Sequence, residues 1–175
     1  MNKENYHNNT YVLLSLGANL GRKRENIENA LNYLSYSGVL FDITASSIYL
    51  TEPVGHSKQP WFFNAVVSGY TNMPLNNFME ICKSVEYIIG RVERERWHER
   101  EIDIDILLFG DGLNDNVKIT IPHPRMHERK FVLVPATEIA GEKVHPKLKR
   151  SINQLLDECT DTSKVSYHSQ FKPEN

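Results

Sequence analysis

Two aspartates separated by one residue lie in an aliphatic run, IDIDILLF at residues 102–109. Alternation with β-branched residues predicts a strand, since successive side chains leave a strand on opposite faces. Asp103 and Asp105 would share one face, while the isoleucines and Leu108 share the other. The two carboxylates would lie about 6.5–7 Å apart, so they could bind one divalent cation or serve two cations bridged by phosphate. A solvent-facing strand gives the same pattern, and the aspartates alone do not decide between these interpretations.

The segment before this strand, residues 91–101, is rich in arginine: Arg91, Arg94, Arg96 and Arg100. Arginine stays charged at biological pH and offers a planar set of donors that matches phosphate oxygens. Arginines that converge on Mg²⁺-binding carboxylates are typical of phosphoryl transfer, where the protein positions the groups and neutralises developing charge. Glutamates alternate with these arginines, so the run alone favours a solvated, ion-paired connection. Next to the aspartates it favours a polyphosphate site.

The composition describes one folded, soluble domain. The chain has 175 residues, of which 40% are hydrophobic, and a formal charge of −2. This charge gives no drive toward nucleic acid or an anionic membrane, and no apolar run could span a bilayer. Two cysteines without metal-ligand spacing or a disulfide framework predict a reducing cytoplasm. We expect a flexible N-terminus at residues 1–9, a single domain at 10–159, and a polar, mobile C-terminal tail at 160–175.

Hydrophobic periodicity predicts the elements that would position these groups. Strands are expected at residues 10–16, 41–50, 61–70 and 102–109, with a shorter one at 117–121. Helices are expected near residues 27–38 and between Pro74 and Gly90, with short helical or irregular pieces at 131–139 and 152–156. The order β-α-β-β-α-β predicts an α+β, ferredoxin-like split βαβ fold, an antiparallel sheet with helices packed on one face. Such a fold hosts many functions and decides none of them.

The third predicted strand carries Phe62 and Asn64 on one face. An aromatic ring beside an amide suits a flat heterocycle, because the ring stacks while the amide matches donor and acceptor edges. An aromatic core strand with one polar residue is a more frequent source of this pattern. Residues 17–21 indicate a strand-to-helix turn, since they lack the lysine of a phosphate-binding loop. The scattered histidines lack the spacing of a metal site.

Together these motifs resemble the 6-hydroxymethyl-7,8-dihydropterin pyrophosphokinase family, from about Tyr11 to Asp157. The most specific part is Arg-x-x-Asp-x-Asp at residues 100–105, which follows Gly-Arg-Val at residues 90–92. The other matching segments are LGAN at 16–19, SIYLTEPVG at 47–55, FFNA at 62–65, RW at 96–97, IPHP at 121–124 and RKF at 129–131.

The resemblance implies an enzyme of folate biosynthesis that transfers pyrophosphate from ATP to the pterin's hydroxymethyl oxygen and releases AMP, and we expect it to be a monomer. Asp103 and Asp105 would hold two Mg²⁺ ions, and Arg91 and Arg100 would complete the catalytic set. The pterin would be bound by Thr51, Val54, Phe62, Asn64, Trp97 and Phe131. ATP would be bound by Glu86, Arg96, Trp97, Arg100, Ile106, Lys118, Thr120, His123 and Arg129. No general base is apparent.

The chain departs from the family pattern at several positions. Ala18 stands where many members carry serine, Glu52 where a second proline is frequent, and His98 where a small residue follows the tryptophan. The segment from Arg91 to Trp97 is also a residue shorter than in some members, which leaves the geometry of this loop and a role for Arg94 open.

Two other functions remain as alternatives. One is another Mg²⁺-dependent nucleotidyl or phosphoryl transferase that uses the same aspartate pair. The other is a ferredoxin-like RNA-binding module whose sheet aromatics stack on bases. The second expects a basic sheet face, whereas this chain is net acidic and places two aspartates on a strand.

Overall fold

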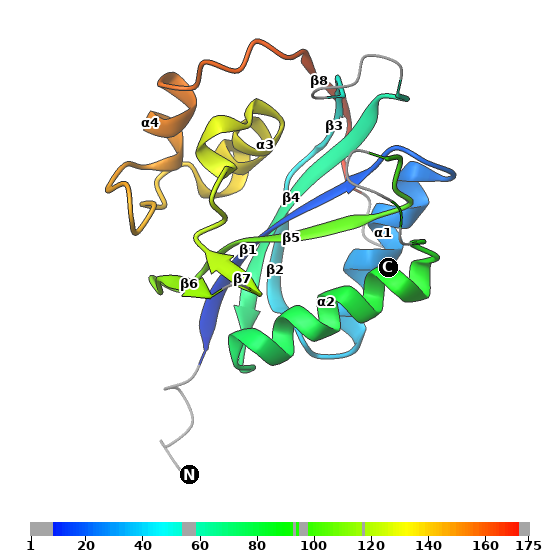
Figure 1. Ribbon diagram of the computed structural model, residues 1–175, viewed down its shortest axis with the longest axis horizontal. Coiled ribbons are helices and arrows are strands. Elements are labelled where there is room, and N and C mark those ends of the chain that lie inside the picture. Colours follow the sequence, from blue (N-terminus) through cyan, green and yellow to red (C-terminus); the bar gives the residue numbers. More distant parts are fainter. Residues whose placement is uncertain (1–8, 54–58, 93, 95–97, 117, 172–175) are drawn as a thin grey trace.

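A six-stranded antiparallel sheet forms the centre of the molecule (Figure 1). The computed structural model describes residues 9–53, 59–92, 94, 98–116 and 118–171. The sheet has the order β5-β1-β4-β3-β8, and β2 also pairs with β4. Its strands are β1 (Thr10–Ala18), β2 (Phe41–Ala45), β3 (Ile48–Thr51), β4 (Phe62–Thr71), β5 (Asp103–Phe109) and β8 (Val165–Ser169). The predicted α+β, ferredoxin-like fold is confirmed.

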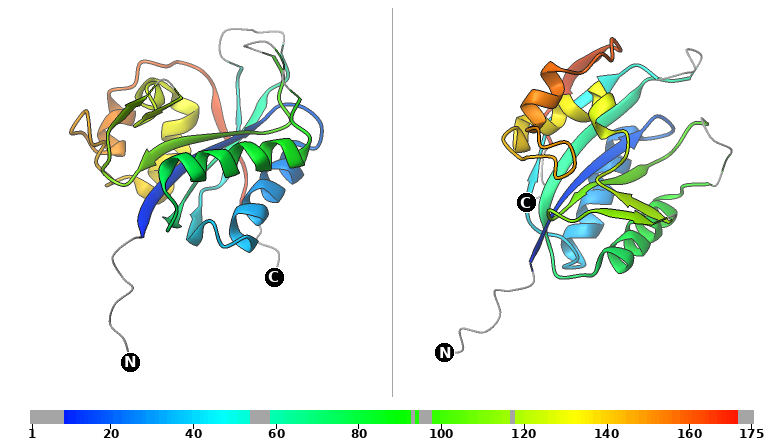
Figure 2. Two further views of the ribbon diagram at one scale, coloured as in Figure 1. Left: turned by 60° about the horizontal axis from the view of Figure 1, so that its bottom comes forward. Right: turned by 60° about the vertical axis from the view of Figure 1, so that its left-hand side comes forward.

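Helices α1 (Lys23–Tyr36) and α2 (Leu75–Ile89) cover one face of the sheet (Figure 2). Their apolar residues, among them Ile27, Leu34 and Phe78, pack against strand residues such as Leu14 and Ile104. Gly90 ends α2 with φ of 103°, a left-handed conformation that glycine adopts without steric cost. The position of this turn matters for the site because it directs the next residues toward β5.

The opposite face of the sheet carries two more helices, so the prediction of helices on one face only is wrong. They are α3 (Lys130–Ala140) and α4 (Ile152–Asp157), which form a second core with Leu13, Val66 and Leu108. The sequence left both segments open as short helical or irregular pieces, and their location depends on contacts that local periodicity does not reveal. They cover only one end of this face.

A β-bulge in β5 also changes the predicted pattern of faces. Leu13 pairs with Leu108 and Leu14 with Ile106, so Leu107 is the extra residue. The bulge reverses the alternation beyond it. Leu108 therefore lies in the core under α3, instead of sharing a face with Ile106.

The remaining elements adjust the predicted boundaries. β1 continues through Gly17 to Ala18, where a turn was expected, and the strand predicted at 41–50 is divided into β2 and β3 at Ser46 and Ser47. A small hairpin comprises β6 (Asn114–Asn116) and β7 (Ile119–Ile121), and a short 3₁₀ helix spans Met126–Glu128. Among the described residues, no helix is long and apolar enough to cross a membrane.

The sequence suggested a mobile tail at residues 160–175, but part of this segment is a strand. Residues Val165–Ser169 form β8, which pairs antiparallel with β3 along a register that includes Thr51 with Val165. The ring of His168 lies 4.3 Å from that of Phe63, between centroids. This strand was missed because its side chains are mostly polar and exposed, as befits the edge of a sheet.

Candidate active site

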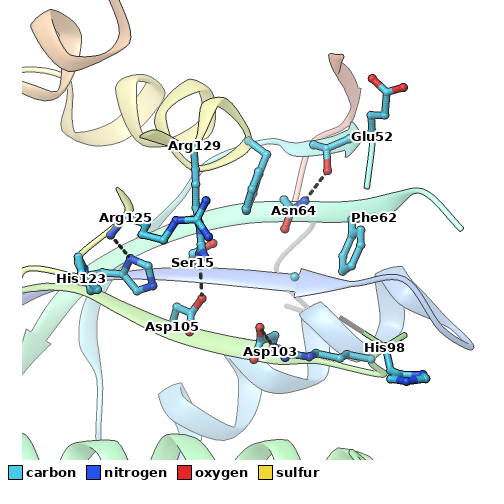
Figure 3. Close-up of a pocket in the computed structure, with 15 residues that line it drawn as sticks. Ser15, Glu52, Phe62, Asn64, His98, Asp103, Asp105, His123, Arg125 and Arg129 are labelled. Carbon is cyan, nitrogen blue, oxygen red and sulfur yellow. Dashed lines mark hydrogen bonds and ion pairs between the residues drawn. The ribbon is translucent and has the colours of Figure 1, made fainter. Parts of the chain in front are cut away.

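Where α3 and α4 leave the sheet face uncovered, its side chains become polar (Figure 3). The register places Ser15 opposite Asp105, and Gly17 between Asp103 on β5 and Asn64 on β4. Strand pairing therefore brings these polar side chains together on one face of the sheet. Under α3 this face carries leucine and valine side chains, and where α3 ends it carries carboxylates and an amide.

These residues form the floor of a cavity of about 440 Å³. Its walls come from the end of β3, the start of α3 and the segments before β5 and after β7. The lining residues are Ser15, Gly17, Thr51, Glu52, Phe62, Asn64, His98, Arg100, Asp103, Asp105, His123, Pro124, Arg125, Arg129 and Phe131. The volume lies within the range expected of a small-molecule site.

Two arginines neutralise Asp103. The Arg91 guanidinium donates to Oδ1 at 2.7 Å, and Arg100 donates to Oδ2. The backbone of Arg100 is held in place by Asn19, because the Arg100 N–H donates to Oδ1 of Asn19 at 2.7 Å. Burial opposes the charge of Arg91, but Asp103 and Glu86 outweigh it and raise the pKa of Arg91. A charged pair of donors is therefore already assembled beside the carboxylate.

Asp105 is less well compensated than its neighbour. Its Oδ2 atom lies 3.8 Å from Arg129, too far for a hydrogen bond. Burial and the nearby charge of Asp103 raise the pKa of Asp105 to about 6. Burial also lowers the pKa of Arg129. Since a carboxylate that resists ionisation is stabilised by added positive charge, this end of the cavity favours a cation.

Glu86, on α2, supports this arrangement from the opposite side of β5. It is only 2% exposed. Its Oε1 atom accepts from the backbone N–H of Ile104 at 2.7 Å, and its carboxylate also pairs with Arg91 and Lys83. The buried charge is thus paired and hydrogen-bonded, as stability requires. Glu86 connects the strand that carries the aspartates to an arginine that contacts one of them.

The other half of the cavity floor presents an oriented amide. Asn64 is 4% exposed, and its Nδ2 donates to Oγ1 of Thr51 at 2.6 Å. Because of this bond, the amide cannot turn freely. A Cβ atom on Gly17 would lie 2.6 Å from Oδ1 of Asn64, so glycine is needed there to keep the amide in place. Phe62 lies beside it and supplies an aromatic wall.

His123 accepts a hydrogen bond at Nδ1 from the backbone N–H of Arg125, at 3.1 Å. Burial, together with the charge of Arg129, lowers the pKa of His123 to about 4. The ring is therefore neutral at physiological pH. Because Nδ1 accepts, the ring proton lies on Nε2, which can donate one hydrogen bond.

This depressed pKa predicts a loss of stability in acid. The unfolded chain takes up a proton at His123 near pH 6.5, while the folded chain resists until about pH 4. Unfolding in this window takes up protons, so the free energy of unfolding falls as the pH is lowered. His123 contributes a loss of at most about 2 kcal/mol at pH 5. His123→Asn, which keeps an acceptor near Nδ1, should reduce the loss. Urea unfolding at pH 7 and 5 measures it, and equal losses in both proteins would contradict the assignment.

The cavity brings together nine of the residues that the family resemblance suggested: Thr51, Phe62, Asn64, Arg100, Asp103, Asp105, His123, Arg129 and Phe131. Arg91 and Glu86 adjoin it through their ion pairs. The side chain of Ile106 is buried in the core under α1 and α2 instead. Lys118 and Thr120 belong to the β6–β7 hairpin and do not line the cavity. Val54, Arg96 and Trp97 lie outside the described residues.

Sequence reasoning missed six lining residues: Ser15, Gly17, Glu52, His98, Pro124 and Arg125. A serine and a glycine inside a buried strand were the available signal for the first two. Arg94 is not among the lining residues. Its guanidinium pairs with Glu101, with Nη2 at 2.6 Å from Oε1. This ion pair connects Arg94 to the C-terminal end of the arginine-rich segment.

The donor set fits Mg²⁺ that is shared with a phosphate ligand. Within the described part of the chain, no cluster of three or more histidine, cysteine or acidic residues could hold a metal ion. Mg²⁺ commonly takes one or two carboxylates and completes its octahedron with water and substrate phosphates. Asp103 and Asp105 supply that number on one face of β5.

The fold and the site together define a class, a ferredoxin-like domain whose cavity places two aspartates and their arginines beside an aromatic wall and an oriented amide. A family model described as 7,8-dihydro-6-hydroxymethylpterin-pyrophosphokinase (HPPK) matches residues 13–141. The chain belongs to this family.

Individual proteins agree with the family match. A 2-amino-4-hydroxy-6-hydroxymethyldihydropteridine pyrophosphokinase of Haemophilus influenzae is 36% identical over 148 residues, covering 85% of this chain and 92% of the relative. One of Bacillus subtilis is 35% identical over 134 residues, covering 77% and 80%. Wild-type Plasmodium falciparum HPPK-DHPS with pteroate has a TM-score of 0.66 at 16% identity, over 86% of this chain and 42% of that one. The last likeness concerns the fold alone.

Proposed function

We infer that this enzyme transfers pyrophosphate from ATP to 6-hydroxymethyl-7,8-dihydropterin in folate biosynthesis, giving AMP and the pterin diphosphate. The observation that carries this inference is the shared sheet face. Asp103 and Asp105 lie on it among arginines, one strand away from the oriented amide of Asn64. A polyphosphate and a hydrogen-bonding ring would therefore meet over β1.

The aspartate side of the cavity suits the triphosphate. Asp103 and Asp105 would hold Mg²⁺, which on binding neutralises phosphate charge and orients the oxygens for in-line displacement. Arg91 and Arg100 are paired with Asp103, and in the bound enzyme their remaining donors face the transferring group. Arg129 contributes a third guanidinium from the start of α3.

The Asn64 side suits the pterin. Phe62 and Phe131 both line the cavity and would stack on the two faces of the ring, while Asn64 reads its polar edge. Stacking fixes the plane, and the amide fixes the rotation within that plane. The hydroxymethyl group would then point along β1 toward the aspartates.

In the reaction, the hydroxymethyl oxygen forms a bond to the β-phosphorus as the bond from that phosphorus to the α-phosphate oxygen breaks. AMP leaves with the electron pair of that bond. The alcohol loses its proton late, to a phosphate oxygen or an aspartate, and we assign no general base. The rate enhancement comes from positioning and charge neutralisation.

The finer parts of the proposal concern the metal ions, the oligomeric state and the compartment. We propose that the enzyme uses two Mg²⁺ ions and is a monomer, whose catalytic domain at residues 10–159 has β8 added to its sheet. We also propose that it acts in the cytoplasm and binds small molecules only. Cys82 and Cys159 are free thiols, consistent with a reducing compartment. An RNA-binding module gives no reason for two aspartates on the sheet face that carries Asn64, and the family match supports neither alternative.

A product assay tests the function. The enzyme is incubated with ATP, Mg²⁺ and 6-hydroxymethyl-7,8-dihydropterin, and AMP is separated from ADP. We expect AMP that depends on the pterin. Release of ADP would indicate single phosphoryl transfer, and the proposed reaction would then be wrong.

Phe131→Ala should weaken pterin binding far more than ATP binding, because it removes one stacking surface. Loss of an aromatic stack costs about 1–3 kcal/mol, so the pterin dissociation constant should rise about 5- to 160-fold. Calorimetry with each substrate measures both affinities. Ile139→Ala, on the same helix but outside the cavity lining, is the matched control. Equal losses for the two substrates would exclude the stacking role.

A further inference from the structure

The segment between α4 and β8 contacts both walls of the cavity, although none of its residues lines it. Figure 1 shows it leaving α4 and passing near α3 to reach β8 beside β3. Asp161 contacts the start of α3, and Lys164 contacts the end of β3. Three peptide units separate these two residues, so they are at most about 11 Å apart. The segment therefore connects the walls by a short path.

At the first wall, Asp161 supplies a cap that α3 lacks. The residue before this helix is Arg129, whose side chain makes no capping hydrogen bond, and the first N–H groups of a helix have no partner within it. Oδ2 of Asp161 accepts from the N–H of Lys130 at 2.9 Å. Its charge is also favourable at a helix N-terminus. Oδ1 accepts from the N–H of Ser163 at 2.9 Å, which fixes the carboxylate.

The capped residue lies between two residues of the site. Arg129 precedes Lys130 and approaches Asp105, and Phe131 follows it and lines the cavity. A shift of the Lys130 backbone would therefore move both side chains. Among the described residues, this N–H donates to no other acceptor.

At the second wall, the same segment holds the end of β3. The N–H of Glu52 donates to the Lys164 carbonyl at 3.0 Å, and the N–H of Lys164 donates to Oε2 of Glu52 at 3.3 Å. Thr51 pairs with Val165 in the β3–β8 ladder. Thr51 is also the residue that orients the amide of Asn64.

We propose that Asp161 is a positioning residue for pterin binding, because it couples the aromatic wall on α3 to the Thr51–Asn64 wall through the 161–165 segment. The proposal rests on the proposed function, since it concerns the pterin side of the same cavity. It gives the C-terminal segment a role in substrate affinity.

The test compares two helix-capping residues on the same face of the sheet. Asp161→Ala removes the cap on α3, and Ser151→Ala removes the cap on α4, where the Ser151 hydroxyl accepts from the N–H of Gln154. Each should lower the unfolding midpoint by about 2–4 °C. Asp161→Ala alone should raise the pterin dissociation constant about 10-fold, because both walls on the pterin side lose preorganisation. ATP affinity should fall less, because Arg129 moves with Lys130 while Arg91 and Arg100 stay paired with Asp103. Asp161→Asn, which keeps one of the two acceptor oxygens, should restore part of the pterin affinity.

Equal pterin affinity in the wild-type protein and Asp161→Ala, with only the midpoint lowered, would overturn the proposal and leave a stabilising cap. Amide hydrogen exchange without substrate supplies an independent measurement. Asp161→Ala should accelerate exchange at both Lys130 and Glu52, whereas acceleration at Lys130 alone would disprove the coupling. A wild-type protein that binds no pterin would contradict the proposed function, and exchange would still decide whether the walls are coupled.

Discussion

Asp103→Asn and Asp105→Asn should each lower kcat at least about 10³-fold at saturating ATP, pterin and Mg²⁺, because each removes a charge that would bind the metal. Asparagine keeps the size of the side chain, so the effect comes from charge. Both residues lie on a strand whose pairing with β1 is made by backbone hydrogen bonds, and the substituted strand should pair in the same way. Steady-state kinetics and circular dichroism measure the two effects.

Asp111→Asn provides the matched control for these variants. Asp111 lies two residues beyond the end of β5, is highly exposed and, among the described residues, pairs only with Lys143. Its replacement changes the same charge in the same part of the chain without touching the cavity, and turnover should stay within about twofold of the wild-type value. Near-normal turnover in Asp103→Asn or Asp105→Asn would contradict the metal assignment.

Asn64→Leu is expected to raise the pterin dissociation constant about 10²–10³-fold and to leave ATP affinity within about threefold, because a site built around a hydrogen-bonding amide discriminates strongly when that amide is lost. The Thr51 hydroxyl would also lose the bond from Nδ2. Calorimetry with each substrate separately measures the effect. Asn153→Leu, at the distant contact with Glu142, controls for loss of a surface amide.

Gly17→Ala tests the same amide without altering it. Since the new Cβ would lie 2.6 Å from Oδ1 of Asn64, the amide must rotate or shift, and pterin affinity should fall in the same direction as in Asn64→Leu. A fall in ATP affinity as large as the fall in pterin affinity, in either variant, would show that Asn64 does not select the pterin.

The local chemistry of the site could be predicted from sequence because it follows short-range rules. Alternation within 102–109 places Asp103 and Asp105 on one face whatever β5 pairs with. The spacing of Phe62 and Asn64 is informative for the same reason. The order of strands and helices then specified the ferredoxin-like fold, since few topologies accommodate it.

The parts that could not be predicted depend on contacts between distant segments. The role of Gly17 follows from its register between β4 and β5, and the bulge at Leu107 follows from packing under α3. β8 has polar, exposed side chains, so its stability comes from backbone pairing with β3, which composition does not reveal. Asp161 caps a helix that begins 31 residues earlier in the chain, whereas the capping patterns readable from sequence are local.

The central claim, transfer of pyrophosphate rather than a single phosphoryl group, is tested most directly by following the label from two ATP preparations, one labelled in the β-phosphate and one in the γ-phosphate. After incubation with Mg²⁺ and 6-hydroxymethyl-7,8-dihydropterin, the pterin product is isolated and its label counted. We predict that both labels appear in the pterin in equal amounts, with one AMP for each product. Transfer of the γ label alone, or of neither label, would contradict the account.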